Sequence, residues 1–389
     1  MVNEKDALPA FLESLQKASV TDGTMARAMN HFLDGKAREQ GIPIHGKFEL
    51  TPLCNLSCKM CYVHLTKGQV DKQAQQLLTV NEWKRIIDEA IDAGMLTAML
   101  TGGEVLTYPG FEEVYTYLQE RGVRTTVKTN GALLDDKRME LFRKYPPDAI
   151  QISIYGSNND AYEKVTGSRC FDRVMHAISL VKESGIPLGI SITPSRFMVE
   201  DAEALLTLTD SLDVEYNINS GLFPAREDTE RDVGDMDLTL DEYVELYHIA
   251  ARLRKDAVTP ACEEDIPAPN GGSSSVEKGL RCAGGRSSFA ICWDGKMHPC
   301  LNFDAISADV LHAPFKDAWK SVNTAANNYP FPRECIGCSF HTICPVCVLC
   351  HEAGALPGHA NRKFCGRAHR MVEEGFASHI LKNRKEEGR

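Results

Sequence analysis

The segment from residue 46 to residue 220 alternates between two hydrophobic periods, and this alternation constrains the fold more than any other feature of the sequence. Amphipathic segments predict helices near 79–94, 111–121, 135–144, 171–184 and 200–211. Six short apolar runs between and beside them predict strands at 46–51, 96–101, 123–128, 149–154, 187–192 and 214–219. The first helix opens with a capping box formed by Thr79 and Glu82. Strands alternating with helices predict an α/β fold with a parallel sheet and right-handed crossovers.

Six strand–helix units are fewer than the eight of a closed barrel, so the expected fold is a partial (β/α)6 TIM-like barrel. We divide the chain into a helical segment at 1–45, the barrel at 46–255, a linker at 256–280 and a cysteine-rich domain at 281–389. Pro, Gly and Ser are concentrated at 260–275, as is typical of a linker. The last region has little apolar periodicity, which indicates a domain held together by metal.

Charge and hydropathy exclude two classes of protein. The net charge of -11 argues against a nucleic-acid binder, because phosphate binding requires a basic face. No apolar run of about 18 residues occurs, and the N-terminus lacks the apolar core of a signal peptide. We therefore expect a cytoplasmic protein without a membrane span. In a reducing compartment, clustered cysteines bind metal or do chemistry more often than they form disulfides.

The first cysteine group is "CNLSCKMCY", in which Cys54, Cys58 and Cys61 directly follow the first predicted strand. The second strand ends in "TGGE", 101–104, and both motifs lie at the strand ends where barrel active sites collect. Three thiolates leave one iron of a 4Fe–4S cluster without a protein ligand, and an open position distinguishes catalytic metal sites. The alternatives at this point are a zinc knuckle with a distant fourth ligand, or cysteines that merely lie in a loop.

The motifs together resemble those of the radical S-adenosylmethionine (radical SAM) enzymes. The resemblance implies that the three cysteines bind a 4Fe–4S cluster whose open iron is chelated by S-adenosylmethionine. Its reductive cleavage then yields methionine and a 5′-deoxyadenosyl radical, which takes a hydrogen atom from the substrate. Further residues match the family's cosubstrate site, in which adenine lies near the aromatic residue and the GGE motif receives the methionine amino group: Tyr62, Gly102, Gly103, Glu104, Asn130 and Ser153. Val105 stands where the family usually has proline.

The second cysteine group resembles the SPASM domain, which carries two auxiliary 4Fe–4S clusters in peptide-modifying radical enzymes. Its members are Cys282, Cys300, Cys335, Cys338, Cys344, Cys347, Cys350 and Cys365. By the family's interleaving, one cluster uses Cys335, Cys338, Cys344 and Cys365. The other uses Cys282 and Cys300 with one or both of Cys347 and Cys350, since "CPVCVLC" departs from the usual spacing. Structural zinc is the alternative.

The resemblance implies a maturase that acts on a peptide or protein, by crosslinking, epimerisation or formylglycine-type oxidation. It also implies an electron donor such as flavodoxin or ferredoxin. Some members of the family carry an N-terminal precursor-binding domain of winged-helix type. The first 45 residues are too short and too helical for such a domain, so we expect a separate leader-binding protein. No residue is assigned here as the hydrogen donor or base of the reaction. The alternatives are a radical SAM dehydrogenase acting on a small molecule such as an amino sugar, and, from another class, an iron–sulfur electron carrier or a metal-stabilised binding module.

Overall fold

A computed structural model describes residues 24–73, 76–219, 221–223, 236–253, 279–280, 282–330, 332–336, 338 and 362–376. Within these residues, nine strands form one sheet in the order β6-β5-β4-β3-β2-β1-β7-β8-β9. The two edge strands, β6 and β9, lie at opposite ends of this order, so the sheet is open. This confirms the predicted α/β fold of the partial-barrel type.

Strands β1 to β6 occupy the six predicted strand segments and are parallel throughout. Their bounds are His45–Glu49, Thr97–Thr101, Arg124–Thr129, Ala149–Ile154, Leu188–Ile192 and Glu215–Ile218. Because the strands are parallel and neighbours in the sheet are consecutive in the chain, their carboxyl ends share one edge. The loop that carries Cys54, Cys58 and Cys61, here called the cysteine loop, follows β1 at this edge. The two-glycine motif, Gly102 and Gly103, follows β2 at the same edge.

The two faces of the sheet differ in polarity. On one face, alternate residues such as Phe48, Leu100 and Ile152 are fully buried in the main core. On the other face, the residues between them include Lys128, Gln151 and Ser153, which are only partly buried. This alternation follows from the period of two in a β-strand. The apolar face is covered by helices, and the polar face is available for a ligand.

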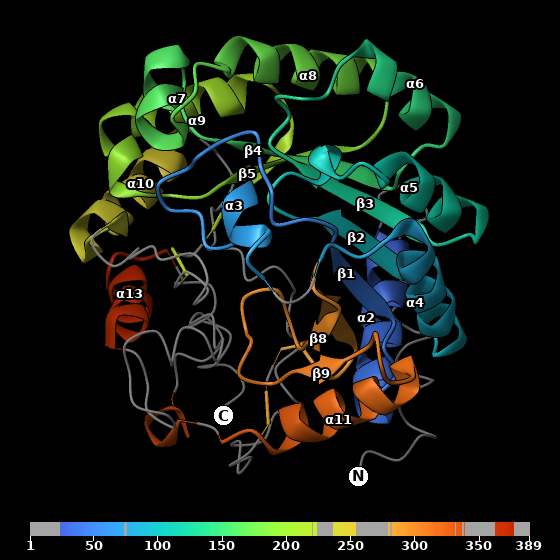
Figure 1. Cartoon of the computed structure of the whole chain (residues 1–389). Coiled ribbons are helices and arrows are strands. Elements are labelled where there is room, and N and C mark those ends of the chain that lie inside the picture. The colour runs from blue at the N-terminus through green and yellow to red at the C-terminus, as the bar shows by residue number, and fades with distance from the viewer. Residues whose placement is uncertain are drawn as a thin grey trace.

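The helices α4 to α10 cover the apolar face in an outer arc around the sheet (Figure 1). Helix α4 confirms the predicted capping box, since Thr79 accepts from the Glu82 backbone and Glu82 accepts from the Thr79 backbone. It buries Trp83 and Ile87 against the sheet, and Phe48 packs edge-on against Trp83. The bounds of the seven are Val80–Asp92, Phe111–Glu120, Asp136–Lys144, Asn159–Thr166, Phe171–Ser184, Ala202–Ser211 and Leu240–Leu253.

The chain beyond the predicted linker extends the same sheet. Strand β7, Ser288–Ile291, pairs parallel with β1, and the antiparallel strands β8, Lys296–His298, and β9, Ala308–Asp309, continue from it. Helix α11, Phe315–Asn328, lies beneath β8 and β9 in Figure 1. The domain boundary predicted near 256–280 falls largely outside the described residues, and the sheet is continuous across it.

Three further helices complete the description. Helix α2, Thr24–Gln40, precedes β1, and the short α3, Lys67–Val70, follows the cysteine loop. Helix α13, Arg362–Glu373, carries Cys365 and packs on α10. Its Arg367 is buried, forms an ion pair with Asp237 at 3.1 Å and lies over the ring of Tyr243. A buried, paired charge therefore fixes this helix to the barrel.

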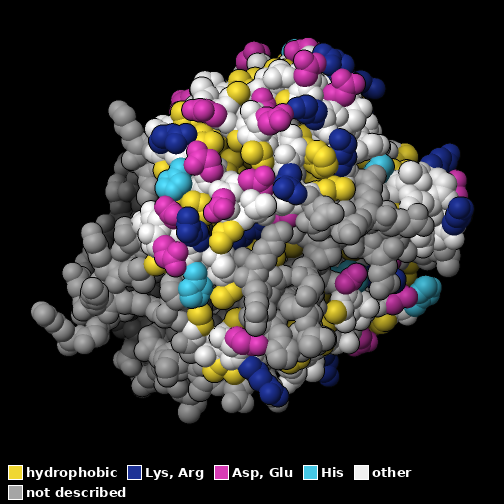
Figure 2. Space-filling view, turned by 90° about the vertical axis from the view of Figure 1, so that its left-hand side faces the viewer, with side chains coloured by type: hydrophobic (Ala, Val, Ile, Leu, Met, Phe, Trp, Pro, Cys, Tyr) yellow, Lys and Arg dark blue, Asp and Glu magenta, His cyan; other side chains and the backbone are white. Residues whose placement is uncertain are grey.

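The surface over α7, α9 and α10 carries acidic and basic side chains in an interspersed pattern (Figure 2). Several form exposed ion pairs, among them Lys164 with Glu200 and Arg196 with Glu242. Exposed pairs of this kind contribute little to stability. No helix in the described part of the chain has the length and apolarity needed to cross a membrane.

Candidate active site

The cysteine loop is fixed to the turn after β2 by backbone hydrogen bonds. Leu50 N donates to Thr101 O at 3.0 Å, and Gly103 N donates to Thr51 O at 2.7 Å. Glu104 N donates to Leu53 O at 2.8 Å. The chain after β1 therefore continues to pair with the chain after β2 beyond the end of the sheet, which places Cys54 beside the two-glycine motif.

Gly102 and Gly103 are required because of this close approach. A Cβ atom on Gly102 would lie 2.5 Å from Thr51 O, and one on Gly103 would lie 2.4 Å from Leu53 O. Gly102 also has a positive φ of 158°. Any side chain at either position would push the cysteine loop away from the turn. The role predicted for these glycines in binding the methionine amino group remains a prediction.

The three cysteines of the loop have partly or fully buried side chains. Leu56 N lies 3.3 Å from Cys54 Sγ, and His64 N lies 3.3 Å from Cys61 Sγ. Burial raises the pKa of Cys54 to about 12 and raises the pKa of Cys58 well above its usual value. The neighbouring thiols add to both pKa shifts, so the three sulfurs lie within electrostatic range of one another. Metal binding must therefore displace protons from these groups.

Asn130 joins the cysteine loop to the end of β3. Its Nδ2 donates to Asn55 Oδ1 at 2.9 Å and lies 3.6 Å from Cys54 Sγ. Its Oδ1 accepts from Ala132 N at 3.0 Å. The structure thus brings together two residues that the sequence predicted separately, Cys54 and Asn130. The amide supports the thiol from the side, in the way that hydrogen bonds to sulfur tune iron–sulfur sites.

Glu104 is held in place by hydrogen bonds within the chain. Its carboxylate is fully buried, and burial raises its pKa. One oxygen accepts from Leu106 N at 3.1 Å and Thr129 Oγ1 at 2.7 Å, and the other accepts from Asn130 N at 2.7 Å. The carboxylate therefore holds the ends of β2 and β3 together, and it keeps acceptor capacity on the second oxygen. Its contact with the methionine amino group remains a prediction.

Tyr155 is a site residue that the sequence reasoning missed. Tyr155 directly follows β4 and is half-buried. Its hydroxyl forms a hydrogen bond with the side chain of Ser153. Burial raises its pKa well above the usual value, and the nearby thiols of Cys58, Cys61 and Cys54 raise it further. The phenol therefore lies within electrostatic range of all three cysteines. Its position one residue beyond a strand end was the available signal.

Ser153 and Tyr62 were also predicted to contact the cosubstrate. Ser153 lies on the polar face of β4, in register with Ser191 of β5. Among the described residues the Ser191 hydroxyl is buried without a hydrogen-bond partner. Tyr62 is half-buried directly behind Cys61. Both positions are compatible with a ligand above the carboxyl edge of the sheet, and their cosubstrate contacts remain predictions.

The second cysteine group is described in part. Cys282, Cys300, Cys335, Cys338 and Cys365 are half-buried, whereas Cys344, Cys347 and Cys350 lie outside the described residues. Burial raises the pKa of Cys365 and the nearby Cys338 raises it further, so these two thiols are neighbours. A Cβ atom on Gly284 would lie 3.3 Å from Cys282 Sγ and 3.2 Å from the carbonyl oxygen of Pro299, the residue directly before Cys300. In the part of the chain with described coordinates, no three His, Cys, Asp or Glu side chains are grouped to hold one metal ion.

Residues 48–208 match the sequence profile of the Radical SAM superfamily. The segment from residue 48 to residue 208 is a radical SAM domain. Domains of this kind bind S-adenosylmethionine and a 4Fe–4S cluster. The matched segment begins in β1 and ends in α9, so it includes the cysteine loop, the two-glycine motif, Asn130 and Ser153. The donor set fits the cluster, because three thiols from one loop at this edge can each bind a different iron.

Curated relatives of the radical SAM domain fall into two kinds. An AdoMet-dependent heme synthase from Methanosarcina barkeri is 26% identical over 77% of this chain and 89% of that protein. A PqqA peptide cyclase from Granulibacter bethesdensis is 32% identical over 47% of this chain and 51% of that protein. The antilisterial bacteriocin subtilosin biosynthesis protein AlbA from Bacillus subtilis is 26% identical over 49% of this chain and 42% of that protein. The chain thus spans about half the length of the two peptide-related relatives.

Solved structures share the fold over most of the chain. SuiB from Streptococcus suis superposes with a TM-score of 0.64 at 16% identity, covering 93% of this chain and 87% of SuiB. The structure of anSMEcpe with bound AdoMet gives a TM-score of 0.68 at 15% identity, covering 88% of this chain and 99% of anSMEcpe. At these identities the likeness concerns the fold, which extends beyond the radical SAM domain itself.

Proposed function

We propose that this chain is a radical SAM enzyme that modifies a peptide or protein substrate. The observation that carries the proposal is the placement of three cysteines in one loop, beside a two-glycine turn, at the carboxyl edge of the sheet in a radical SAM domain. When bound, a 4Fe–4S cluster and S-adenosylmethionine supply a 5′-deoxyadenosyl radical that takes a hydrogen atom from the substrate. The relatives that act in peptide cyclisation and bacteriocin biosynthesis support a peptide substrate.

The chain's own residues hold and shield this site. Cys54, Cys58 and Cys61 bind the cluster, and the backbone of Leu56 and His64 donates to two of the sulfurs. Burial of Cys58 and the side chain of Asn130 limit the access of water to the loop. Each donor to sulfur favours the deprotonated, metal-binding form of the thiol.

The polar face of the sheet provides the surface over which cosubstrate and substrate lie. Lys128 and Gln151 are register partners on adjacent strands, and both side chains are only partly buried. Among the residues with described positions, Lys128 forms no ion pair. An unpaired ammonium on this face favours a polar substrate that brings a negative or hydrogen-bonding group.

We also propose two auxiliary 4Fe–4S clusters in the C-terminal region, giving three clusters in all. The proximity of Cys338 and Cys365 supports their assignment to one cluster, and the proximity of Cys282 to the Pro299 carbonyl supports pairing it with Cys300. Electrons reach the catalytic cluster from a donor such as flavodoxin or ferredoxin. Recognition of a leader segment by a separate protein is a further part of this proposal.

A small-molecule substrate is the second candidate. The match to the AdoMet-dependent heme synthase covers 77% of this chain and 89% of that protein, far more than the matches to peptide-related proteins. A match over 77% of the chain extends well beyond the radical SAM domain at 48–208. We therefore place a heme precursor beside a peptide as the substrate to be tested.

The test uses the full chain, reconstituted with iron and sulfide without oxygen, with S-adenosylmethionine and dithionite. Formation of 5′-deoxyadenosine and methionine is expected, and its absence from a cluster-loaded protein would contradict the proposal. Two substrate arms follow: Fe-coproporphyrin III, and the short peptides encoded beside this gene. Faster 5′-deoxyadenosine formation with a mass change in a peptide supports the peptide substrate. The same response with the porphyrin alone selects the second candidate.

A further inference from the structure

The end of helix α7 makes direct contact with the cysteine loop. Ser57 N donates to Thr166 O at 3.0 Å, and Lys59 N donates to Val165 O at 3.1 Å. These two loop residues flank Cys58 on either side. The last carbonyl groups of a helix have no partner within the helix, so they must find donors elsewhere. Here the loop provides two of them, and Cys58 is held between two hydrogen bonds.

The shape of the last turn of α7 depends on the Thr166 hydroxyl. It donates to Tyr162 O at 2.7 Å and accepts from Ser168 N at 3.2 Å. Thr166 is fully buried, so water cannot replace these bonds. Gly167 follows with a φ of 71° and donates to Glu163 O, which ends the helix at this residue. The hydroxyl thus fixes the turn whose carbonyls hold Ser57 and Lys59.

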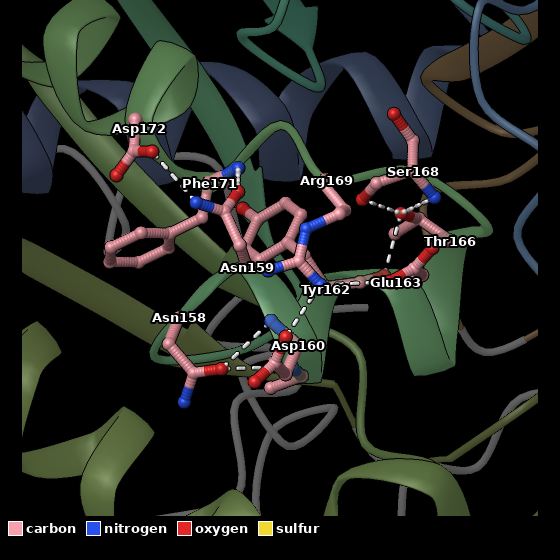
Figure 3. A network of polar contacts seen from close by, with 11 residues as sticks. Asn158, Asn159, Asp160, Tyr162, Glu163, Thr166, Ser168, Arg169, Phe171 and Asp172 are labelled. Carbon is pink, nitrogen blue, oxygen red and sulfur yellow. Dashed lines mark hydrogen bonds and ion pairs between the residues drawn. The ribbon is translucent and has the colours of Figure 1, made fainter.

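Other contacts at this corner are more exposed. Figure 3 shows Arg169 between Asp160 and Glu163, and Asn159 facing Asp172. The side chains of the Arg169 ion pairs are 54–81% exposed. Because exposed ion pairs contribute little, the buried hydroxyl is the main side-chain restraint on the turn.

We propose that Thr166 is a positioning residue for the catalytic cluster and acts through the backbone of the loop on either side of Cys58. This inference rests on the proposed function, because it concerns the cluster that the loop binds. Without the hydroxyl, the last turn of α7 loosens and the two loop N–H groups lose their fixed acceptors. Freed N–H groups then turn toward the sulfurs. A positive dipole near the cluster stabilises its more negative reduced state, so the midpoint potential rises.

The experiment compares Thr166→Val, which removes the hydroxyl, with Thr166→Ser, which keeps it. Thr209→Val is the matched control, because Thr209 is also fully buried and its hydroxyl donates to Leu205 O at 2.7 Å, four residues back, in α9. The readouts are the midpoint potential of the cluster signal that S-adenosylmethionine perturbs, the rate at which a chelator removes that cluster, and amide hydrogen exchange at 57–59 in the metal-free chain.

For Thr166→Val we expect the cluster to be lost about threefold to tenfold faster than in the wild type, because this factor corresponds to the net contribution of one neutral hydrogen bond. We also expect a higher midpoint potential and faster exchange at 57–59, with Thr166→Ser and Thr209→Val close to wild type. Equal behaviour of Thr166→Val and wild type, or the same change in Thr209→Val, would overturn the role while leaving the proposed function standing. A wild-type chain without a cluster that responds to S-adenosylmethionine would overturn both.

Discussion

The two groups of cysteines are placed by the fold in opposite ways. Cys54, Cys58 and Cys61 lie within one loop, and that loop is fixed by hydrogen bonds to the turn after β2 and to the end of α7. The described cysteines of the second group come from separate segments, at Cys282, Cys300, 335–338 and Cys365. The first site is thus preformed by the scaffold. The proposed second site would be assembled from distant parts of the chain, and metal binding would supply part of the free energy of that assembly.

The helical covering shows the same difference. Helices α4 to α9 follow strands of the barrel in chain order, so each local unit brings its own cover. Helix α13, which carries Cys365, reaches the barrel only through long-range contacts such as the buried pair of Arg367 with Asp237. A site built from such contacts is sensitive to changes far from its ligands.

The largest expected effect is the loss of iron from the first cysteine group while the second group keeps its iron. Replacing Cys54, Cys58 and Cys61 together with alanine should remove about a third of roughly twelve irons per chain and all cleavage of S-adenosylmethionine, since each 4Fe–4S cluster holds four irons. Iron analysis and assay of 5′-deoxyadenosine measure the two quantities. Cys292→Ala is the control, because this buried thiol follows β7 and belongs to neither group. Zinc in place of iron, or loss of all iron in the triple variant, would contradict independent sites.

A second prediction concerns how the first site is preformed. Glu104→Gln removes a carboxylate that accepts three internal hydrogen bonds, and the amide that replaces it has only one acceptor oxygen. We expect the free energy of unfolding of the metal-free chain to fall by about 1–3 kcal/mol, since a buried donor is left unsatisfied. Urea unfolding measures it, with the exposed Glu112→Gln as control.

The alternative for Glu104 is direct contact with the methionine ammonium. That role predicts unchanged stability and a loss of S-adenosylmethionine affinity on the order of tenfold to a hundredfold. A binding titration with S-adenosylmethionine, measured beside the unfolding curves, distinguishes the structural role of Glu104 from the cosubstrate role. Weakened binding at unchanged stability would support the role expected from the motif.

The parts of the fold that were predictable from sequence are those that depend on local pattern. The six barrel strands and the capping box of α4 follow from hydrophobic period and local hydrogen-bonding residues, and the sequence shows both directly. Strand β7 was missed because it has four residues, Ser288–Ile291, and its partner β1 lies more than 200 residues earlier. Helix α7 was missed because eight residues are too few for a clear helical period.

The site was predictable to the same degree. The cysteine spacing and the two glycines are readable in the sequence, because each lies within a few residues. The hydrogen bonds of the Glu104 side chain could not be predicted from the sequence. Their donors, Thr129 and Asn130, lie 25 and 26 residues away, at the end of another strand. The proximity of Tyr155 to the thiols likewise depends on the order of strands in the sheet. Sequence motifs thus identified the ligands, and the fold decided which polar groups support them.

The last prediction concerns the attachment of the second region to helix α2, which precedes the barrel. Asp34 on α2 accepts a hydrogen bond from Oγ of Ser287, the residue directly before β7, at 2.6 Å. It also forms an ion pair with Arg38 at 2.6 Å. Burial raises the pKa of Asp34, but hydrogen bonds from His45, Ser287 and Arg38 outweigh it and lower the pKa to about 2. The native state therefore favours the carboxylate. Its contribution is fully present above the unfolded pKa of 3.8 and is lost as the pH falls toward 2.

For Asp34→Asn we expect the free energy of unfolding at pH 7 to fall by about 2 kcal/mol, which corresponds to this pKa difference. The difference between variant and wild type should shrink between pH 4 and pH 2. Urea unfolding of the metal-free chain at several pH values measures it, and Asp136→Asn, whose side chain is 76% exposed, is the control. If iron in the second group is also lost in Asp34→Asn while the first group keeps its cluster, the attachment at Ser287 helps to assemble the distant site. An equal pH dependence in both variants would show that Asp34 does not hold the two regions together.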